Sequence, residues 1–144
     1  MKLFTIGYAT ATQGEVIDRL KRAGVAVLID VRAVAASRRA GFSKRLLAAG
    51  LADAGIDYVH LRALGTPAAG RHAARAGRTG EMHRIYNAYL DHEPTAGAEL
   101  AEAERIASSR PAALLCLEAD ARQCHRALIA QRLEARAGFE VVNL

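Results

Sequence analysis

The densest group of reactive side chains in the sequence lies between Cys116 and Arg126. A thiol near the start of a helix, beside a histidine and an arginine, has physical reasons for a lowered pKa and greater reactivity. Cys116 and Cys124 are the candidate thiols, and His125 is the histidine beside them. Glu118 could act as a general base or orient a neighbour, and Arg126 could hold a phosphate or a carboxylate through two hydrogen bonds. Each residue also has an ordinary interpretation, since a cysteine in an apolar strand is often a small buried hydrophobic side chain.

A second candidate group begins with Asp30 and Arg32. Their side chains alternate along a strand and face the same side, so they form either a structural ion pair or part of an anion site. No acidic residue between Val31 and Ala52 offsets the cations there. Lys44 opens a helix whose dipole disfavours it, and an anion held by the helix N–H groups and by Arg38 or Lys44 would relieve that conflict. A solvated basic face is the alternative.

Metal and cofactor sites receive little support from the sequence. Cys116, Cys124 and His125 are zinc-type ligands, and His60 could be a fourth, but their spacing matches no compact C-x-x-C pattern. Adjacent cysteine and histidine residues on a helix should also point in different directions. Neither of the glycine-rich phosphate motifs occurs. We therefore expect no metal and no cofactor.

The elements that must position these residues follow from hydrophobic periodicity and capping signals. Strands are predicted at Lys2–Gly7, Val25–Val31, Ile56–Leu61, Ala112–Leu117 and Phe139–Leu144. Helices are predicted from Thr12 to Gly24, from Ser43 to Gly55, around Met82–Leu90, over Ala98–Ser108, and from an Asp120 cap to about Ala137. The pattern indicates a single three-layer α/β domain over residues 1–144, with a mostly parallel sheet of about five strands and helices on both faces.

In open parallel sheets, ligands bind beyond the carboxyl ends of the strands, and this rule selects the candidate site. The catalytic candidates are Asp30, Cys116, Glu118, Cys124 and His125. The candidates for substrate binding are Tyr8, Arg32, Ser37, Arg38, Lys44 and Arg126. The segment Thr66–Gly80, rich in glycine and arginine, is predicted to be a mobile basic loop or a poorly ordered surface excursion.

Composition narrows the classes of protein and partner. Hydrophobic residues make up 51% of the chain and charged residues 24%, which permits a packed core and excludes wholesale disorder. The net charge of +5 favours anionic partners. We expect a phosphate-containing small molecule or nucleic acid, no membrane, and an oligomeric state that the sequence leaves open. Two cysteines are too few for a disulfide scaffold, so reduced thiols and a cytoplasmic location are expected.

Five ordered motifs resemble a known family. They are Thr5-Ile6-Gly7-Tyr8, Ile29-Asp30-Val31-Arg32, Ser37-Arg38-Arg39 with Gly41-Phe42-Ser43-Lys44, Leu64-Gly65, and Leu115-Cys116-Leu117-Glu118 with Cys124-His125-Arg126. Together they resemble the bacterial and archaeal family catalogued as domain of unknown function 488. The resemblance implies a compact α/β fold in a prokaryotic cytosol and no established reaction. The chain departs from the family pattern in Ala9 after Tyr8 and in Ala36 before Ser37.

Three functions remain open at this stage. The first is an enzyme for a phosphorylated or nucleotide-like substrate, with Arg32, Arg38, Lys44 and Arg126 holding the anion and Asp30, Glu118 and His125 moving protons. The second is cysteine-dependent chemistry, loosely similar to that of rhodanese-type sulfurtransferases, although Leu117–Gln123 lacks the glycines of a thiolate cradle. The third is a nucleic-acid-binding module without catalysis, for which aromatic residues are scarce.

Overall fold

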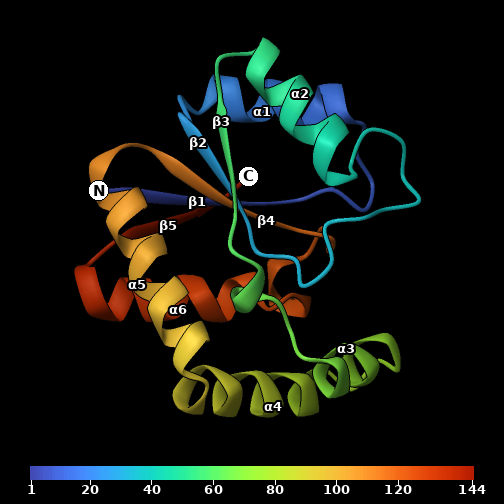
Figure 1. The fold of residues 1–144 in the computed structure, drawn as a ribbon, viewed down its shortest axis with the longest axis vertical. Coiled ribbons are helices and arrows are strands. Elements are labelled where there is room, and N and C mark those ends of the chain that lie inside the picture. Colours follow the sequence, from blue (N-terminus) through green and yellow to red (C-terminus); the bar gives the residue numbers. More distant parts are fainter.

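The computed structural model describes residues 1–144 and has an α/β fold around a five-stranded, all-parallel sheet (Figure 1). The strands are β1 (Lys2–Gly7), β2 (Val27–Asp30), β3 (Asp57–His60), β4 (Ala112–Cys116) and β5 (Glu140–Asn143). Their order is β3-β2-β4-β1-β5. The central strand β4 therefore separates β1 from β2, although these two are consecutive in the chain. The predicted α/β class with about five strands is confirmed.

Six α-helices connect the strands. They are α1 (Gln13–Arg22), α2 (Lys44–Asp53), α3 (Ala68–Arg75), α4 (Thr79–His92), α5 (Pro94–Ser109) and α6 (Arg126–Ala137), with short 3₁₀ turns η1 (Arg62–Leu64) and η2 (Ala121–Gln123). None of them combines the length and apolar character needed to cross a bilayer.

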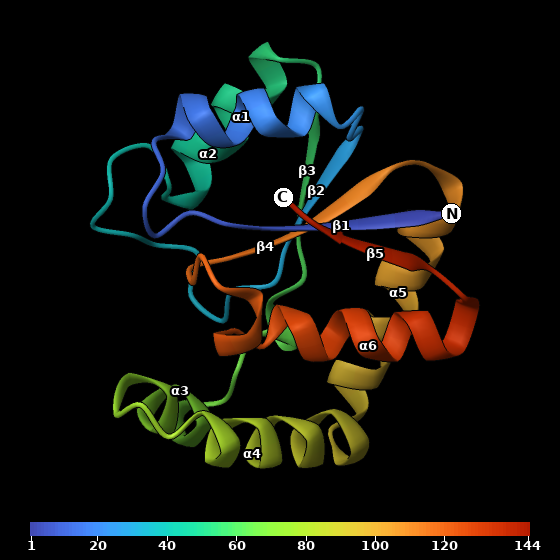
Figure 2. The same cartoon turned by 180° about the vertical axis from the view of Figure 1, so that it is seen from behind.

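The sheet separates two hydrophobic cores, as the period of two along each strand requires. On β1, Phe4 and Ile6 face the core formed with α1 and α2, while Leu3 faces the core formed with α5 and α6. Figures 1 and 2 show α1 and α2 on one side of the sheet and the other four helices on the opposite side. The three layers predicted from the sequence are thus present.

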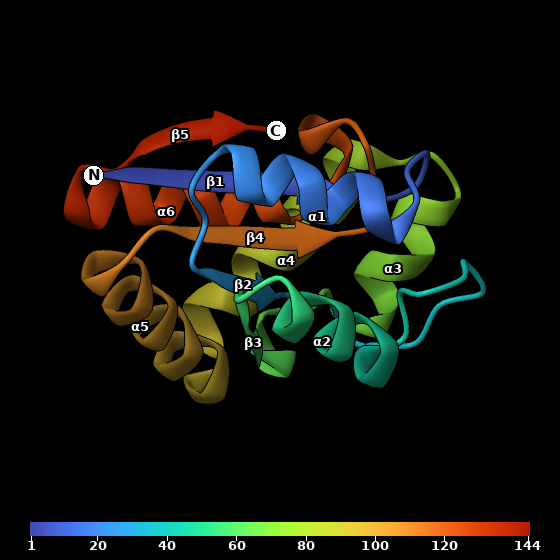
Figure 3. The ribbon, with the colours of Figure 1, turned by 90° about the horizontal axis from the view of Figure 1, so that it is seen from above.

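The helix pair α3–α4 extends the larger core away from the sheet. Tyr86 of α4 is fully buried, and its hydroxyl donates to the Leu64 carbonyl at 2.5 Å. The Tyr89 hydroxyl donates to the Ala63 carbonyl at 2.7 Å. These two bonds fix the connection that follows β3 and place α3 near the carboxyl ends of the strands, toward which the arrowhead of β4 points in Figure 3.

The prediction of a mobile loop over Thr66–Gly80 is wrong, because α3 occupies most of it and α4 begins at Thr79. Pro67 stands at the cap position, which suits a residue without an N–H donor. The alanines that follow favour helix strongly enough to offset Gly70. Gly77, with φ of +78°, ends the helix in the left-handed conformation.

The predicted start of the last helix also needs correction. Asp120 accepts a hydrogen bond from the backbone N–H of Arg122, but it caps only the turn η2. The helix α6 begins six residues later, at Arg126, with His125 at its cap position. Similarly, α5 begins at Pro94 rather than Ala98, because Pro94 is preorganised for a first helical position.

Two other capping predictions have different outcomes. The capping box at α1 is confirmed, since the Thr12 hydroxyl accepts from the Glu15 N–H at 3.1 Å and the Glu15 carboxylate accepts from the Thr12 N–H at 2.9 Å. Ser43 occupies the cap position of α2, but its hydroxyl makes no bond to that helix. It accepts instead from the N–H of Ser37 at 3.1 Å and so closes the loop before α2.

Candidate functional site

A cavity of about 380 Å³ opens at the carboxyl ends of β1, β2 and β4. It lies where the strand order changes direction, which is the expected ligand position in such sheets. The side chains with polar or sulfur atoms that line it are Tyr8, Arg32, Thr66, Arg71, Arg75, Met82, Cys116, Glu118, Gln123, Cys124 and His125. Six of the eleven predicted site residues are among them. The structure therefore brings together motifs from both ends of the chain.

The backbone after β4 is held tightly against the end of β1. The N–H groups of Tyr8 and Ala9 both donate to the Leu117 carbonyl, at 3.1 and 2.8 Å. A Cβ atom on Gly7 would lie 1.8 Å from the Glu118 carbonyl oxygen. Only glycine permits this approach, which positions Glu118 at the cavity.

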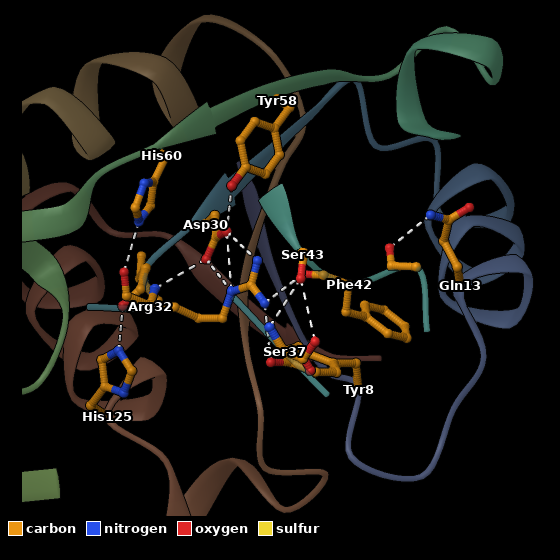
Figure 4. Close-up of polar contacts among 12 residues, drawn as sticks. Tyr8, Gln13, Asp30, Arg32, Ser37, Phe42, Ser43, Tyr58, His60 and His125 are labelled. Atoms are coloured by element: carbon orange, nitrogen blue, oxygen red, sulfur yellow. Dashed lines mark hydrogen bonds and ion pairs between the residues drawn. The ribbon is translucent and has the colours of Figure 1, made fainter. Parts of the chain in front are cut away.

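Asp30 and Arg32 form a buried ion pair beside the cavity (Figure 4). The Arg32 Nη2 lies 2.7 Å from Asp30 Oδ2, and Nε donates to the same carboxylate. Arg32 Nη1 donates to the Phe42 carbonyl at 2.7 Å and to the Tyr8 hydroxyl at 3.1 Å. The Tyr58 hydroxyl donates to Asp30 Oδ2 at 2.5 Å.

This network indicates that Asp30 and Arg32 support the wall of the cavity. Burial alone would lower the pKa of Arg32, but the hydrogen bonds and charge of Asp30 outweigh it and raise that pKa. Burial, together with the bond to Asp30, raises the pKa of Tyr58. Because Asp30 is fully buried and already holds three side-chain donors, the geometry favours the ion-pair alternative over an anion clamp.

Two histidines donate hydrogen bonds to the backbone of the turn that follows β2. His60 Nε2 donates to the Arg32 carbonyl at 2.8 Å, and His125 Nε2 donates to the Val31 carbonyl at 2.6 Å (Figure 4). A carbonyl only accepts, so Nε2 of His125 carries the proton and Nδ1 of the neutral ring carries a lone pair. Burial lowers the pKa of His125 to about 4, which keeps the ring neutral near pH 7.

The lone pair of His125 faces a cluster of sulfur atoms at the cavity wall. Cys124 Sγ lies 3.7 Å from His125 Nδ1 and is paired with Cys116 Sγ in a disulfide. The expectation that Cys124 and His125 point in different directions is wrong, because Cys124 is extended (φ −122°, ψ 147°) and precedes the helix. The prediction of reduced thiols is also wrong for this structure, because Cys116 and Cys124 form a disulfide.

Arg126 lies behind this cluster and is 1% exposed. Its Nη1 lies 3.4 Å from Cys116 Sγ and donates to the Glu118 carbonyl, while Nη2 donates to the Ala119 carbonyl. Burial lowers the pKa of Arg126 to about 10. Its Nε has no partner, and no carboxylate lies within ion-pair distance. Arg126 therefore supports the backbone around Glu118 and places a positive charge beside sulfur.

Besides Arg126, three predicted anion-binding residues lie outside the cavity, and their roles stay predictions. Ser37 closes its own loop with Ser43. Arg38 is exposed on that loop. Lys44 lines a second, more open cavity of about 960 Å³, together with His60 and other residues of the β3–α3 connection.

The sequence placed Arg71 and Arg75 in a basic loop and not in the site, but both line the cavity from α3. Arg71 donates to the Thr66 carbonyl at 2.8 Å, and neither guanidinium has an acidic partner. Their spacing of four residues was the available signal, since it places both on one helix face. Glu118, across the cavity, is half-buried, and its carboxylate has no partner in the protein.

Comparisons with known proteins give one result. A family model described as Domain of unknown function DUF488 matches residues 12–133. No curated protein and no solved structure matches the chain.

Proposed function

The chain belongs to the DUF488 family, and we propose that it is an enzyme that hydrolyses a small, phosphate-bearing substrate in the cavity at the carboxyl edge of the sheet. The observation that supports this proposal is that one cavity holds both cationic and anionic side chains that have no partner in the protein. Arg71 and Arg75 have no acidic partner, and the Glu118 carboxylate has no donor. Both kinds of group are therefore available to a ligand.

The arginines support an anionic substrate of limited size. Guanidinium groups bind phosphate oxygens through paired, charge-assisted hydrogen bonds. A volume of about 380 Å³ falls at the lower end of small-molecule sites, which run from roughly 300 to 1,000 Å³. A phosphorylated metabolite or a nucleotide fits this range better than a nucleic acid polymer does.

Glu118 supplies the proton-transfer group. Its backbone is fixed by the Gly7 contact and by Arg126, so the carboxylate is presented from a rigid support. A free carboxylate beside a bound phosphate can accept a proton from water and return it to a leaving group. Asp30, held by Arg32, supports the cavity wall in this scheme and transfers no proton.

Binding of inorganic phosphate and of ADP, measured calorimetrically, tests the anion site. A charge-assisted hydrogen bond contributes about 1.5–3 kcal/mol, so Arg71→Ala and Arg75→Ala should each weaken binding roughly ten- to a hundredfold. Arg45→Ala is the matched control, because Arg45 is an exposed, unpaired arginine that lines neither cavity. Equal weakening in the control would show that the effect is one of net charge, and the assignment would then fail.

Turnover of a panel of phosphate esters tests Glu118. Glu118→Gln should retain ADP binding and lose roughly a hundredfold or more in rate, the usual contribution of general acid–base catalysis. If Glu118→Gln leaves both binding and turnover intact, the proposed proton transfer is incorrect.

Thiol chemistry is the second candidate, because the Cys116 sulfur lies beside the Arg126 guanidinium at the cavity wall. Once the Cys116–Cys124 disulfide is reduced, the neighbouring guanidinium favours a thiolate over a thiol. Alkylation rates of the reduced protein against pH would give the pKa of the Cys116 thiol. A value near or above roughly 8.5 removes this candidate. Nucleic acid binding stays a prediction from net charge.

A further inference from the structure

We propose that, once the Cys116–Cys124 disulfide is reduced, Cys116, Cys124 and His125 bind one zinc ion at the wall of the cavity, with the fourth coordination position open to a water molecule. The ligand atoms of these three residues lie within 4.8 Å of one another. Three protein ligands and an open position are typical of catalytic zinc, whereas structural zinc has four protein ligands. The proposal replaces the expectation that the chain holds no metal.

The spacing of the donors supports a tetrahedral ion. Zinc bonds of about 2.3 Å to sulfur and 2.0–2.1 Å to nitrogen place a sulfur and a nitrogen ligand about 3.6 Å apart. The Cys124 Sγ to His125 Nδ1 distance of 3.7 Å matches this value. The Cα atoms of Cys116 and Cys124 are 7.1 Å apart, wider than the roughly 4.4–6.8 Å of ordinary disulfides. After reduction of the disulfide, side-chain rotation can therefore admit an ion between the two sulfurs.

The histidine is prepared for coordination. A metal-binding histidine usually donates its other ring N–H to a carboxylate or a backbone carbonyl, which fixes the ring and the tautomer. His125 makes this bond through Nε2 to the Val31 carbonyl at 2.6 Å. Its Nδ1 lone pair then points at the sulfurs. His60 is not a fourth ligand, because its Nε2 is bonded to the Arg32 carbonyl.

The surrounding charges fit a bound zinc ion. Arg126 is buried without a carboxylate partner, and its Nη1 reaches Cys116 Sγ. Coordination converts both thiols to thiolates. Zinc and Arg126 then offset the two thiolates and the Glu118 carboxylate, so the charges of these five groups sum to zero.

Zinc at this place would supply the nucleophile for the hydrolysis proposed above, and this step rests on that proposal. Zinc lowers the pKa of a bound water to about 7. Glu118 takes one proton from the water, and the hydroxide adds to the phosphorus of the substrate. The bond to the leaving oxygen breaks, and that oxygen takes the proton from Glu118. Water is the only co-reactant.

Metal content and cobalt spectroscopy test the site without any assay of activity. The reduced full-length chain, loaded with Zn²⁺ and dialysed, should retain about one ion per chain. Loaded with Co²⁺, it should show thiolate-to-cobalt charge transfer and the visible bands of tetrahedral cobalt. Cys124→Ser and His125→Gln should each weaken zinc affinity at least roughly tenfold. His92→Gln, an exposed histidine on α4, is the matched control and should keep full affinity.

A second measurement, alkylation of the thiols in the wild-type chain, tests the site even if a variant fails to fold. Bound zinc should slow alkylation of both cysteines, and a chelator should restore the rate. Retention of no metal by the reduced, folded chain overturns the proposal, as does cobalt binding without a thiolate band. In either case phosphate binding through Arg71 and Arg75 can persist, so failure of the zinc site is distinguishable from failure of the proposed function.

Discussion

Replacing Arg32 by methionine should destabilise the fold severely. The change leaves the Asp30 carboxylate fully buried, with the Tyr58 hydroxyl as its one remaining side-chain donor. Breaking a buried pair in this way costs about 3–5 kcal/mol. Domains of this kind have a free energy of unfolding of about 5–15 kcal/mol. The loss therefore removes a large share of the stability and lowers the Tm by roughly 6–20 °C.

Urea denaturation of Arg32→Met and of a matched surface variant measures this effect. Arg22→Met removes the exposed Arg22–Asp18 pair and should change stability far less, because solvent screens that pair. The double variant Asp30→Leu/Arg32→Met should recover much of the loss, since an apolar pair leaves no uncompensated charge. If Arg32→Met and Arg22→Met cost the same, the Asp30–Arg32 pair is not the dry, buried contact described above.

Two further substitutions test the contacts that support the cavity. Gly7→Ala should displace the backbone at Glu118 and lower both stability and phosphate binding. The control is Gly97→Ala on α5, which should keep or raise the Tm because a Cβ there meets no atom within 4 Å. Equal melting curves for the two variants would contradict the close approach at Gly7. Tyr86→Phe should cost about 1–3 kcal/mol in chemical denaturation, because the Leu64 carbonyl loses its buried donor; an unchanged midpoint would show that water replaces the hydroxyl.

Much of the fold could be predicted from local sequence signals. The bounds of β1 and the capping box at Thr12 follow from short-range chemistry that tertiary contacts do not override. The loop predicted over Thr66–Gly80 failed because its glycines were given more weight than its alanines. The early start predicted for α6 failed because an aspartate can cap a 3₁₀ turn as readily as a helix.

The site was harder to predict, because its chemistry depends on contacts between distant residues. Cys116 and Glu118, which were selected because they follow the carboxyl end of a strand, both line the cavity. Selection by strand ends could not show that Tyr58, on the neighbouring strand, completes the shell of Asp30. Nor could it show that Cys124 is extended, which is what allows its sulfur to approach the ring of His125.

The central position of β4 has a consequence for how the chain assembles during synthesis. The first two strands have no hydrogen bonds to each other and each pairs with β4. A ribosome-bound chain that ends before Ala112 therefore lacks the strand that joins them. Because such long-range pairing is slow and leaves apolar surface exposed meanwhile, the nascent segment before Ala112 should be prone to aggregation until β4 emerges.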